Sequence, residues 1–180
     1  IEAGATSVYF GIEHLNMRSR SSANFTTKDL HTIVARCQAV GIKTYLTLNT
    51  VMYPEDLPLM QEIVDNAKLA GVSAIIASDI AALQYAYQQG VEVHLSTQLN
   101  IANTEALKFY AQYADVVVLA RELNMDQVAS IHRDIIEQDI RGPKGELIRI
   151  EMFCHGALCM AVSGKCYLSL NNLGASANRG

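Results

Sequence analysis

The chain has no tryptophan, three prolines and four cysteines, and neither sign of charge is in large excess. Four cysteines in 180 residues are too few for a disulfide scaffold and suit a reducing compartment, so we expect a cytoplasmic protein. A net charge of −4 provides no basic footprint for nucleic acid over this stretch. No apolar run has the length of a transmembrane helix, so no membrane partner is expected.

Three familiar active-site motifs are also missing. No G-x-G-x-x-G follows an apolar run, which argues against a dinucleotide-binding fold. The chain contains neither the H-E-x-x-H of zinc peptidases nor the G-x-S-x-G of serine hydrolases. Local sequence alone therefore identifies no peptidase machinery.

One unit recurs along the chain: a helical pattern closed by glycine, a short β-branched run, and a polar residue. Glycine closes the helix before SVYF, KTYLTL, SAIIA and EVHL, at Gly4, Gly41, Gly71 and Gly90. Two more strands are predicted at 116–120 and 147–153. Helical patterns lie between the strands, at about 27–40, 55–70, 79–89, 104–113 and 125–138.

Alternating strands and helices predict a parallel sheet of right-handed βαβ units. We expect an α/β fold, an incomplete (β/α)8 TIM-barrel-like arc of about six parallel strands with outer helices. A full barrel has eight strands and about 250 residues. The chain opens without methionine, in what reads as a helix end running into a strand. We therefore expect one partial barrel domain over 1–180 that begins after the first strand of the barrel.

Polar residues follow nearly every predicted strand, as on the catalytic face of a TIM barrel. They are Asn49, Ser78, Thr97, Gln98, Arg121, Glu122 and His155. The carboxyl ends of the strands are thus the expected site.

The segment 151–169 holds three of the four cysteines, Cys154, Cys159 and Cys166, beside a glutamate and a histidine. Their C-x4-C-x6-C spacing differs from the C-x2-C of zinc ribbons and ferredoxins, so spacing leaves metal ligands and buried structural thiols both open. Cys154 reads as a small filler near the barrel top. Cys37 falls on the buried stripe of its helix and reads as core.

This segment resembles the signature of the collagenase-like peptidase family, class U32, which reads E-x-F-x-x-G-[SA]-[LIVM]-C-x4-G-x-C-x-[LIVM]-S. All ten specified positions match: Glu151, Phe153, Gly156, Ala157, Leu158, Cys159, Gly164, Cys166, Leu168 and Ser169. The stretches LAREL and HLNMRSRSSANFT are also similar to the family. The resemblance therefore covers essentially the whole chain, which ends just past the signature.

The resemblance implies that Cys159 and Cys166 ligate a four-iron iron–sulfur cluster in the full-length protein, with further cysteines supplied beyond Gly180. No cluster is expected in this stretch alone. It also implies an oxygen-independent hydroxylase acting on RNA bases or a related small substrate. A peptidase acting on peptides is the alternative, and a non-catalytic RNA-binding module with structural cysteines is a third.

The candidate catalytic residues are Glu122, Glu151 and His155, with Gln98 expected beside them at the strand ends. Two purely structural roles are the alternatives. Arg149 and Glu151 could form a buried ion pair, and Arg121 and Glu122 could form a surface ion pair at the start of the helix that follows them. The candidate substrate-binding residues are Arg18, Arg20, Gln98 and Arg121. The uncovered edge strands of an arc, near 6–10 and 147–153, predict a homo-oligomer.

Overall fold

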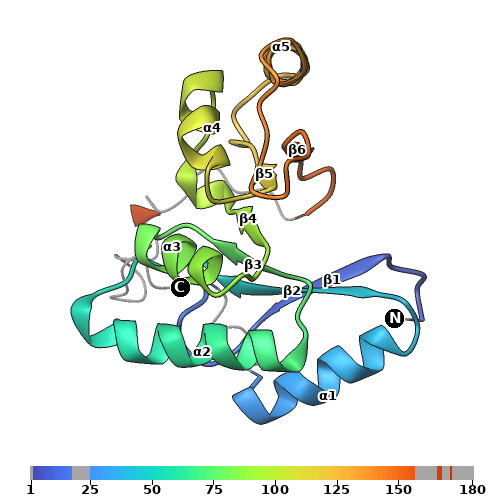
Figure 1. The fold of residues 1–180 in the computed structure, drawn as a ribbon, viewed down its shortest axis with the longest axis vertical. Helices are drawn as coiled ribbons and strands as arrows, with labels where there is room; N and C mark the ends of the chain where they lie inside the picture. Colours follow the sequence, from blue (N-terminus) through green and yellow to red (C-terminus); the bar gives the residue numbers. More distant parts are fainter. Residues whose placement is uncertain (1, 18–24, 157–165, 168–170, 172–180) are drawn as a thin grey trace.

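The computed structural model describes residues 2–17, 25–156, 166–167 and 171. Within them, six parallel strands form one sheet in the sequential order β1-β2-β3-β4-β5-β6. The sheet curls into a half-barrel in which β1 and β6 are the two edges (Figure 1). This confirms the predicted incomplete barrel. None of the described helices is long and apolar enough to cross a membrane.

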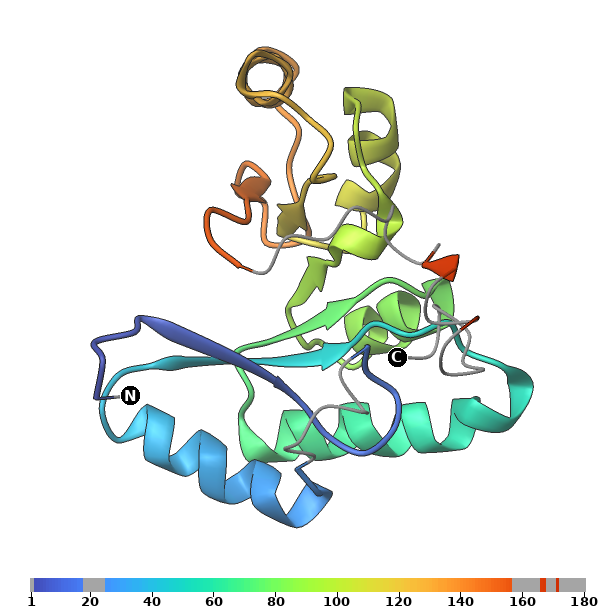
Figure 2. The ribbon, with the colours of Figure 1, turned by 180° about the vertical axis from the view of Figure 1, so that it is seen from behind.

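The strands are β1 (Ser7–Gly11), β2 (Lys43–Leu48), β3 (Ala74–Ala77), β4 (Val93–Leu95), β5 (Val116–Val118) and β6 (Arg149–Glu151). The helices are α1 (Thr27–Gln38), α2 (Leu57–Ala70), α3 (Ile80–Gln88), α4 (Thr104–Ala111) and α5 (Met125–Glu137), with short 3-10 turns η1 (Pro54–Asp56) and η2 (Thr97–Leu99). Each helix ends within two residues of its predicted position. Figure 2 shows α1 and α2 lying along the β1–β3 part of the sheet, whereas α4 and α5 lie beyond β5.

The recurring glycines have the backbone conformation that the sequence pattern predicts. Gly71, for example, has a φ of 77° and closes α2, and Val72 N–H then donates to Ala67 O at 3.0 Å. L-residues with a side chain are strained at such an angle, whereas glycine adopts it freely. The chain can therefore reverse tightly from each helix into the next strand.

The two faces of the sheet differ in chemistry. Leu48, Ala77, Leu95, Val117 and Ile150 are register partners across β2 to β6, and all belong to or pack against the core under the helices. Side chains alternate between faces along a strand. The neighbouring row must therefore point to the concave face, and it consists of Thr47, Ile76, His94, Val116 and Arg149. That row places a histidine and an arginine inside the curl.

Strand β6 is shorter than the predicted 147–153. Before it, Leu147 forms an antiparallel bridge with Arg141, and Ile148 N–H donates to Ile140 O at 3.0 Å. After it, β5 has already ended at Val118, so the residues beyond Glu151 have no partner strand on that side. Backbone pairing with neighbouring segments thus limits this strand to three residues.

Candidate functional site

A polar network joins the carboxyl ends of β2, β3 and β4. The side-chain nitrogen of Asn49 donates to Ser96 Oγ at 3.3 Å and to Gln98 Oε1 at 3.2 Å, and Ser96 also donates to Gln98. Ser78 Oγ donates to the Asn49 carbonyl at 2.9 Å, and Asn49 Oδ1 accepts the Met17 N–H at 3.1 Å. These bonds hold Gln98 at the end of the half-barrel where the sequence predicts a site.

The other predicted residues lie at the same end but are less tightly held. Glu151 is the last residue of β6 and pairs in register with Val118. Glu122 follows β5 and His155 follows β6, and both are exposed. Among the residues that the structure describes, no hydrogen bond or ion pair joins Glu122 or His155 to Gln98 or Glu151. Their convergence therefore stays a prediction.

The candidate substrate-binding arginines are placed only in part. Arg121 lies in the exposed turn after β5. Arg18 and Arg20 lie outside the described residues, as does the predicted ligand Cys159.

An ionic cluster that the sequence did not predict lies one layer deeper on the concave face. His94, in the middle of β4, is only 3% exposed. Its Nε2 lies 3.2 Å from Glu92 Oε1, and its ring stacks at a tilt on Tyr45 with centroids 4.6 Å apart. Arg149 donates to Glu92 Oε1 at 2.8 Å, and the Lys144 ammonium also pairs with Glu92. The predicted alternative, an Arg149–Glu151 pair, is replaced by this pairing with Glu92.

Burial and charge set the proton affinities in this cluster. Burial lowers the pKa of His94 below its ordinary value, although the nearby Glu92 carboxylate opposes the shift. Burial alone would raise the pKa of Glu92, but hydrogen bonds from Lys144 and His94 together bring it below the usual range. Burial raises the pKa of Glu151. For Tyr45, burial and then the charges of Glu151 and Glu92 raise the phenol pKa.

These shifts define the hydrogen-bonding roles of the ring. A Glu92 carboxylate only accepts hydrogen bonds, so a neutral His94 carries its proton on Nε2. Nδ1 is then an acceptor, and it lies 4.0 Å from Glu151 Oε2. Within the described residues this buried Nδ1 has no hydrogen-bond partner. The arrangement therefore places the acceptor nitrogen of a buried imidazole opposite a carboxyl at the strand end, at a separation longer than a hydrogen bond.

The sequence carried one signal for this cluster. In E-V-H-L, charged Glu92 and titratable His94 alternate with apolar residues, so both point to one face of a short strand. That alternation could have identified the pair. The contact with Arg149 could not have been found locally, because it joins residues 57 positions apart.

A family model described as peptidase family U32 matches residues 1–180. The chain belongs to peptidase family U32. It is 66% identical over 180 residues to a protein named collagenase from Porphyromonas gingivalis, covering 100% of this chain and 44% of the relative. It is 36% identical over 178 residues to a 23S rRNA 5-hydroxycytidine synthase from Escherichia coli, covering 98% of this chain and 25% of the relative. The chain thus spans less than half the length of these relatives.

The fold agrees with this family. The solved U32 peptidase Mk0906 superposes with a TM-score of 0.61 at 14% sequence identity, covering 72% of this chain and 57% of that one. At that identity the likeness concerns the fold alone. The curled arrangement of parallel strands is therefore shared with a known U32 structure.

The cysteines of this U32 chain do not build a metal centre from the described residues alone. Cys37 is buried in the core, Cys154 is exposed and Cys166 is partly buried. In the part of the chain that the structure describes, no group of three or more His, Cys, Asp or Glu side chains could hold a metal ion. A four-iron cluster normally takes four thiolates. The described residues alone do not supply four thiolates.

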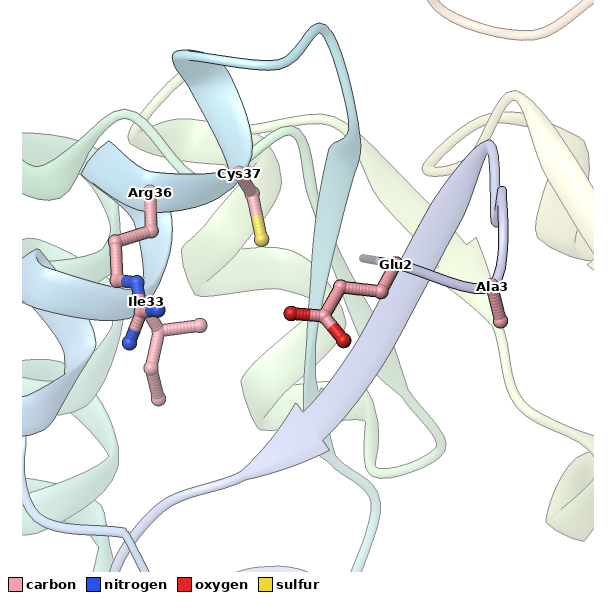
Figure 3. A pocket seen from close by; sticks show the side chains of 5 residues that line it. All are labelled: Glu2, Ala3, Ile33, Arg36 and Cys37. Carbon is pink, nitrogen blue, oxygen red and sulfur yellow. The ribbon is translucent and has the colours of Figure 1, made fainter.

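A cavity of about 480 Å³ lies apart from the ionic cluster. Its lining comes from Glu2 and Ala3 near the start of the described chain and from Ile33, Arg36 and Cys37 on α1. Figure 3 shows the Glu2 carboxylate pointing from the β1 side toward this helix. The cavity belongs to the helix side of the sheet, so it adds nothing to the concave-face cluster.

Proposed function

We propose that this U32 chain is the barrel part of a peptidase that cleaves collagen-like or denatured collagen peptides. The observation that carries the proposal is the 66% identity, over all 180 residues, to a protein named collagenase. The relative named for RNA hydroxylation is much less similar, at 36%. Glu151, beside the concave-face cluster, supports the proposal, because its side chain is 47% exposed and peptide hydrolysis needs a group that exchanges protons at a water-accessible position.

The test is an assay of the full-length protein on denatured collagen, with the release of new amino termini as the measurement. We expect cleavage, and we expect it to survive the double substitution Cys159→Ser and Cys166→Ser. Glu146→Gln, in the exposed loop before β6, is a control that should leave activity unchanged. Absence of cleavage by the intact protein, or its complete loss in the cysteine variant, would contradict the proposal.

Oxygen-independent hydroxylation of an RNA base or a related small substrate is the second candidate. Two observations favour it: the matched signature cysteines and the relative named 5-hydroxycytidine synthase. It predicts iron and sulfide in full-length protein purified without air, and loss of both in the Cys159→Ser, Cys166→Ser variant. Stoichiometric iron retained in that variant would rule out these two cysteines as ligands.

We also propose that the protein works in a reducing compartment such as the cytoplasm. Two cysteines of the described structure, the buried Cys37 and the exposed Cys154, are free thiols. Free thiols persist where cellular reductants keep them reduced. Thiol counting on freshly isolated protein under denaturing conditions tests this, and an extensive loss of free thiols would contradict it.

A further inference from the structure

Specific contacts fix the side chain of His94 in the core of the concave face. Its ring is 3% exposed, its Nε2 lies 3.2 Å from Glu92, and one face contacts the Tyr45 ring. Glu92 is in turn fixed by the cations of Lys144 and Arg149. This chain of contacts fixes both the orientation and the tautomer of the imidazole.

The opposite ring nitrogen is the unexplained feature. Nδ1 is buried and has no hydrogen-bond partner among the described residues. Leaving a buried polar atom unpaired is unfavourable, so such an atom calls for a reason. The carboxyl facing it is Glu151, whose Oε2 is 4.0 Å away and whose side chain is 47% exposed. Glu151 therefore reaches both the buried imidazole and the solvent at the strand ends.

We propose that Glu151 is the catalytic acid–base group of this site and that His94 is the positioning residue that orients it. The inference rests on the proposed peptidase function, since it names the residues that would move the proton in peptide hydrolysis. Glu151 ends β6, and its register partner Val118 ends β5. It thus lies at the carboxyl end of the strands, where barrel enzymes bind their substrates.

The step balances without any further reagent. A water molecule forms a bond from its oxygen to the peptide carbonyl carbon and gives one proton to the Glu151 carboxylate. Glu151 then gives that proton to the leaving nitrogen as the carbon–nitrogen bond breaks, which yields a carboxylic acid and an amine. When Glu151 is protonated and the 4.0 Å separation shortens to a hydrogen-bond distance, its O–H would donate to His94 Nδ1, and this bond would hold the carboxyl in place between the two transfers.

Other charged groups around His94 must be included in any pH dependence. Glu92 lies two residues before it, immediately ahead of β4, Tyr45 stacks on it from β2, and Arg149 acts on it from β6 through its charge. Asp115, just before β5, also acts on His94 through its charge. Glu92 and Asp115 favour the imidazolium, whereas Arg149 and burial oppose it. The pH dependence of Glu151 variants must therefore be measured with all four of these neighbours unchanged.

The kinetic experiment uses the full-length protein and a fluorogenic denatured-collagen substrate. Glu151→Gln should lower kcat by about 100-fold or more, the usual loss for an acid–base group, while KM changes little. His94→Gln should lower kcat less and displace the pH profile of kcat/KM, and Glu151→Asp should recover part of the activity. Glu146→Gln and His132→Gln, both at exposed positions, are the matched controls. An unchanged pH profile in His94→Gln, or near-normal kcat in Glu151→Gln, would overturn the assignment.

A second measurement is independent of activity. NMR titration of the His94 ring should show that Glu151→Gln lowers the imidazole pKa by about one unit, because a carboxylate within about 4 Å favours the cation. If Glu151→Gln lowers the His94 pKa but the intact protein cleaves no peptide, the His94–Glu151 pair stands and only the proposed peptidase function is contradicted. An unchanged His94 titration in Glu151→Gln would defeat the pair, whatever the activity.

Discussion

At the scale of single residues, Gly11 is the described glycine with the least room for a side chain. A Cβ atom there would lie 2.2 Å from Asn16 Cγ. Asn16 is 1% exposed, and its side chain donates to Ile12 O at 3.2 Å and Glu13 O at 3.3 Å. The end of β1 is therefore packed directly on a buried amide.

We predict that Gly11→Ala lowers the free energy of unfolding by about 1–3 kcal/mol, because Asn16 cannot move away without losing its hydrogen bonds. Urea denaturation measures the change. Gly156→Ala, where a Cβ meets nothing within 4 Å, is the control. The double variant Gly11→Ala, Asn16→Ala should lose less than the sum of the two single variants. Additive losses would show that the two residues do not clash.

His94 also makes stability depend on pH. Its folded-state pKa lies below its ordinary value of 6.5, so near that pH the unfolded chain binds more protons than the folded one. Stability should therefore fall as pH drops from about 7.5 to 5.5. Glu92 acts at lower pH, because its pKa is lowered from the ordinary value of 4.5. The pKa of Glu151 is raised from 4.5, so that group makes stability fall as pH rises above 4.5, with a sign opposite to that of His94.

The measurement is urea denaturation of wild type and His94→Gln at several values in that pH window. We expect the slope of unfolding free energy against pH to flatten in the variant. An identical slope in both proteins would mean that another group causes the dependence.

At the scale of elements, α5 has the best-formed start. Asn124 accepts the Gln127 N–H at 2.9 Å, and the Gln127 side chain accepts the Asn124 N–H at 2.9 Å. This reciprocal arrangement satisfies backbone donors that a helix start otherwise leaves open. The helix that connects β5 to β6 thus has a defined first turn.

Asn124→Ala should destabilise the protein by about 1 kcal/mol, whereas Asn124→Ser, which keeps an acceptor, should cost less. Thermal or urea unfolding measures both. Equal losses for Ala and Ser would show that the side-chain acceptor does not matter.

The elements were largely predictable from sequence, as was the position of Gln98 and Glu151 at the strand ends, but the ionic cluster around His94 was not, for a physical reason. Glycine closures such as Gly71 and the α5 cap are local signals, read within a few residues. Glu92, by contrast, bonds to Lys144 and Arg149, 52 and 57 positions away. Only the register of β4, β5 and β6 brings these side chains together. The seven-residue prediction for β6 failed similarly, because pairing with neighbouring segments determines where that strand ends.

At the scale of the whole molecule, burial is greatest in the middle of the sheet. All four residues of β3 and all three of β4 are buried, whereas two of the three residues of the edge strand β6 are exposed. Amides in well-buried strands exchange only on large openings. We predict that β3 and β4 amides exchange most slowly in hydrogen–deuterium exchange and that β6 amides exchange faster. Equal protection across the sheet would contradict this.

The open edges lead to a related prediction. β1 and β6 are the two edges of the described sheet, and an edge strand can pair with another chain. If a second copy covers either edge, the hydrogen-exchange protection of that edge should rise with protein concentration, and light scattering should report a mass above that of one chain. A monomer at all concentrations would argue against self-association through the edges.

The strictly sequential strand order also bears on how the chain reaches this shape during translation. Each strand pairs with the one made just before it: Ser7 lies beside Lys43 and Ile75 beside Val93, so adjacent partners are separated by at most about 40 residues. A nascent chain leaving the ribosome can therefore add strands one after another, each docking on an edge already present, without waiting for its final residues.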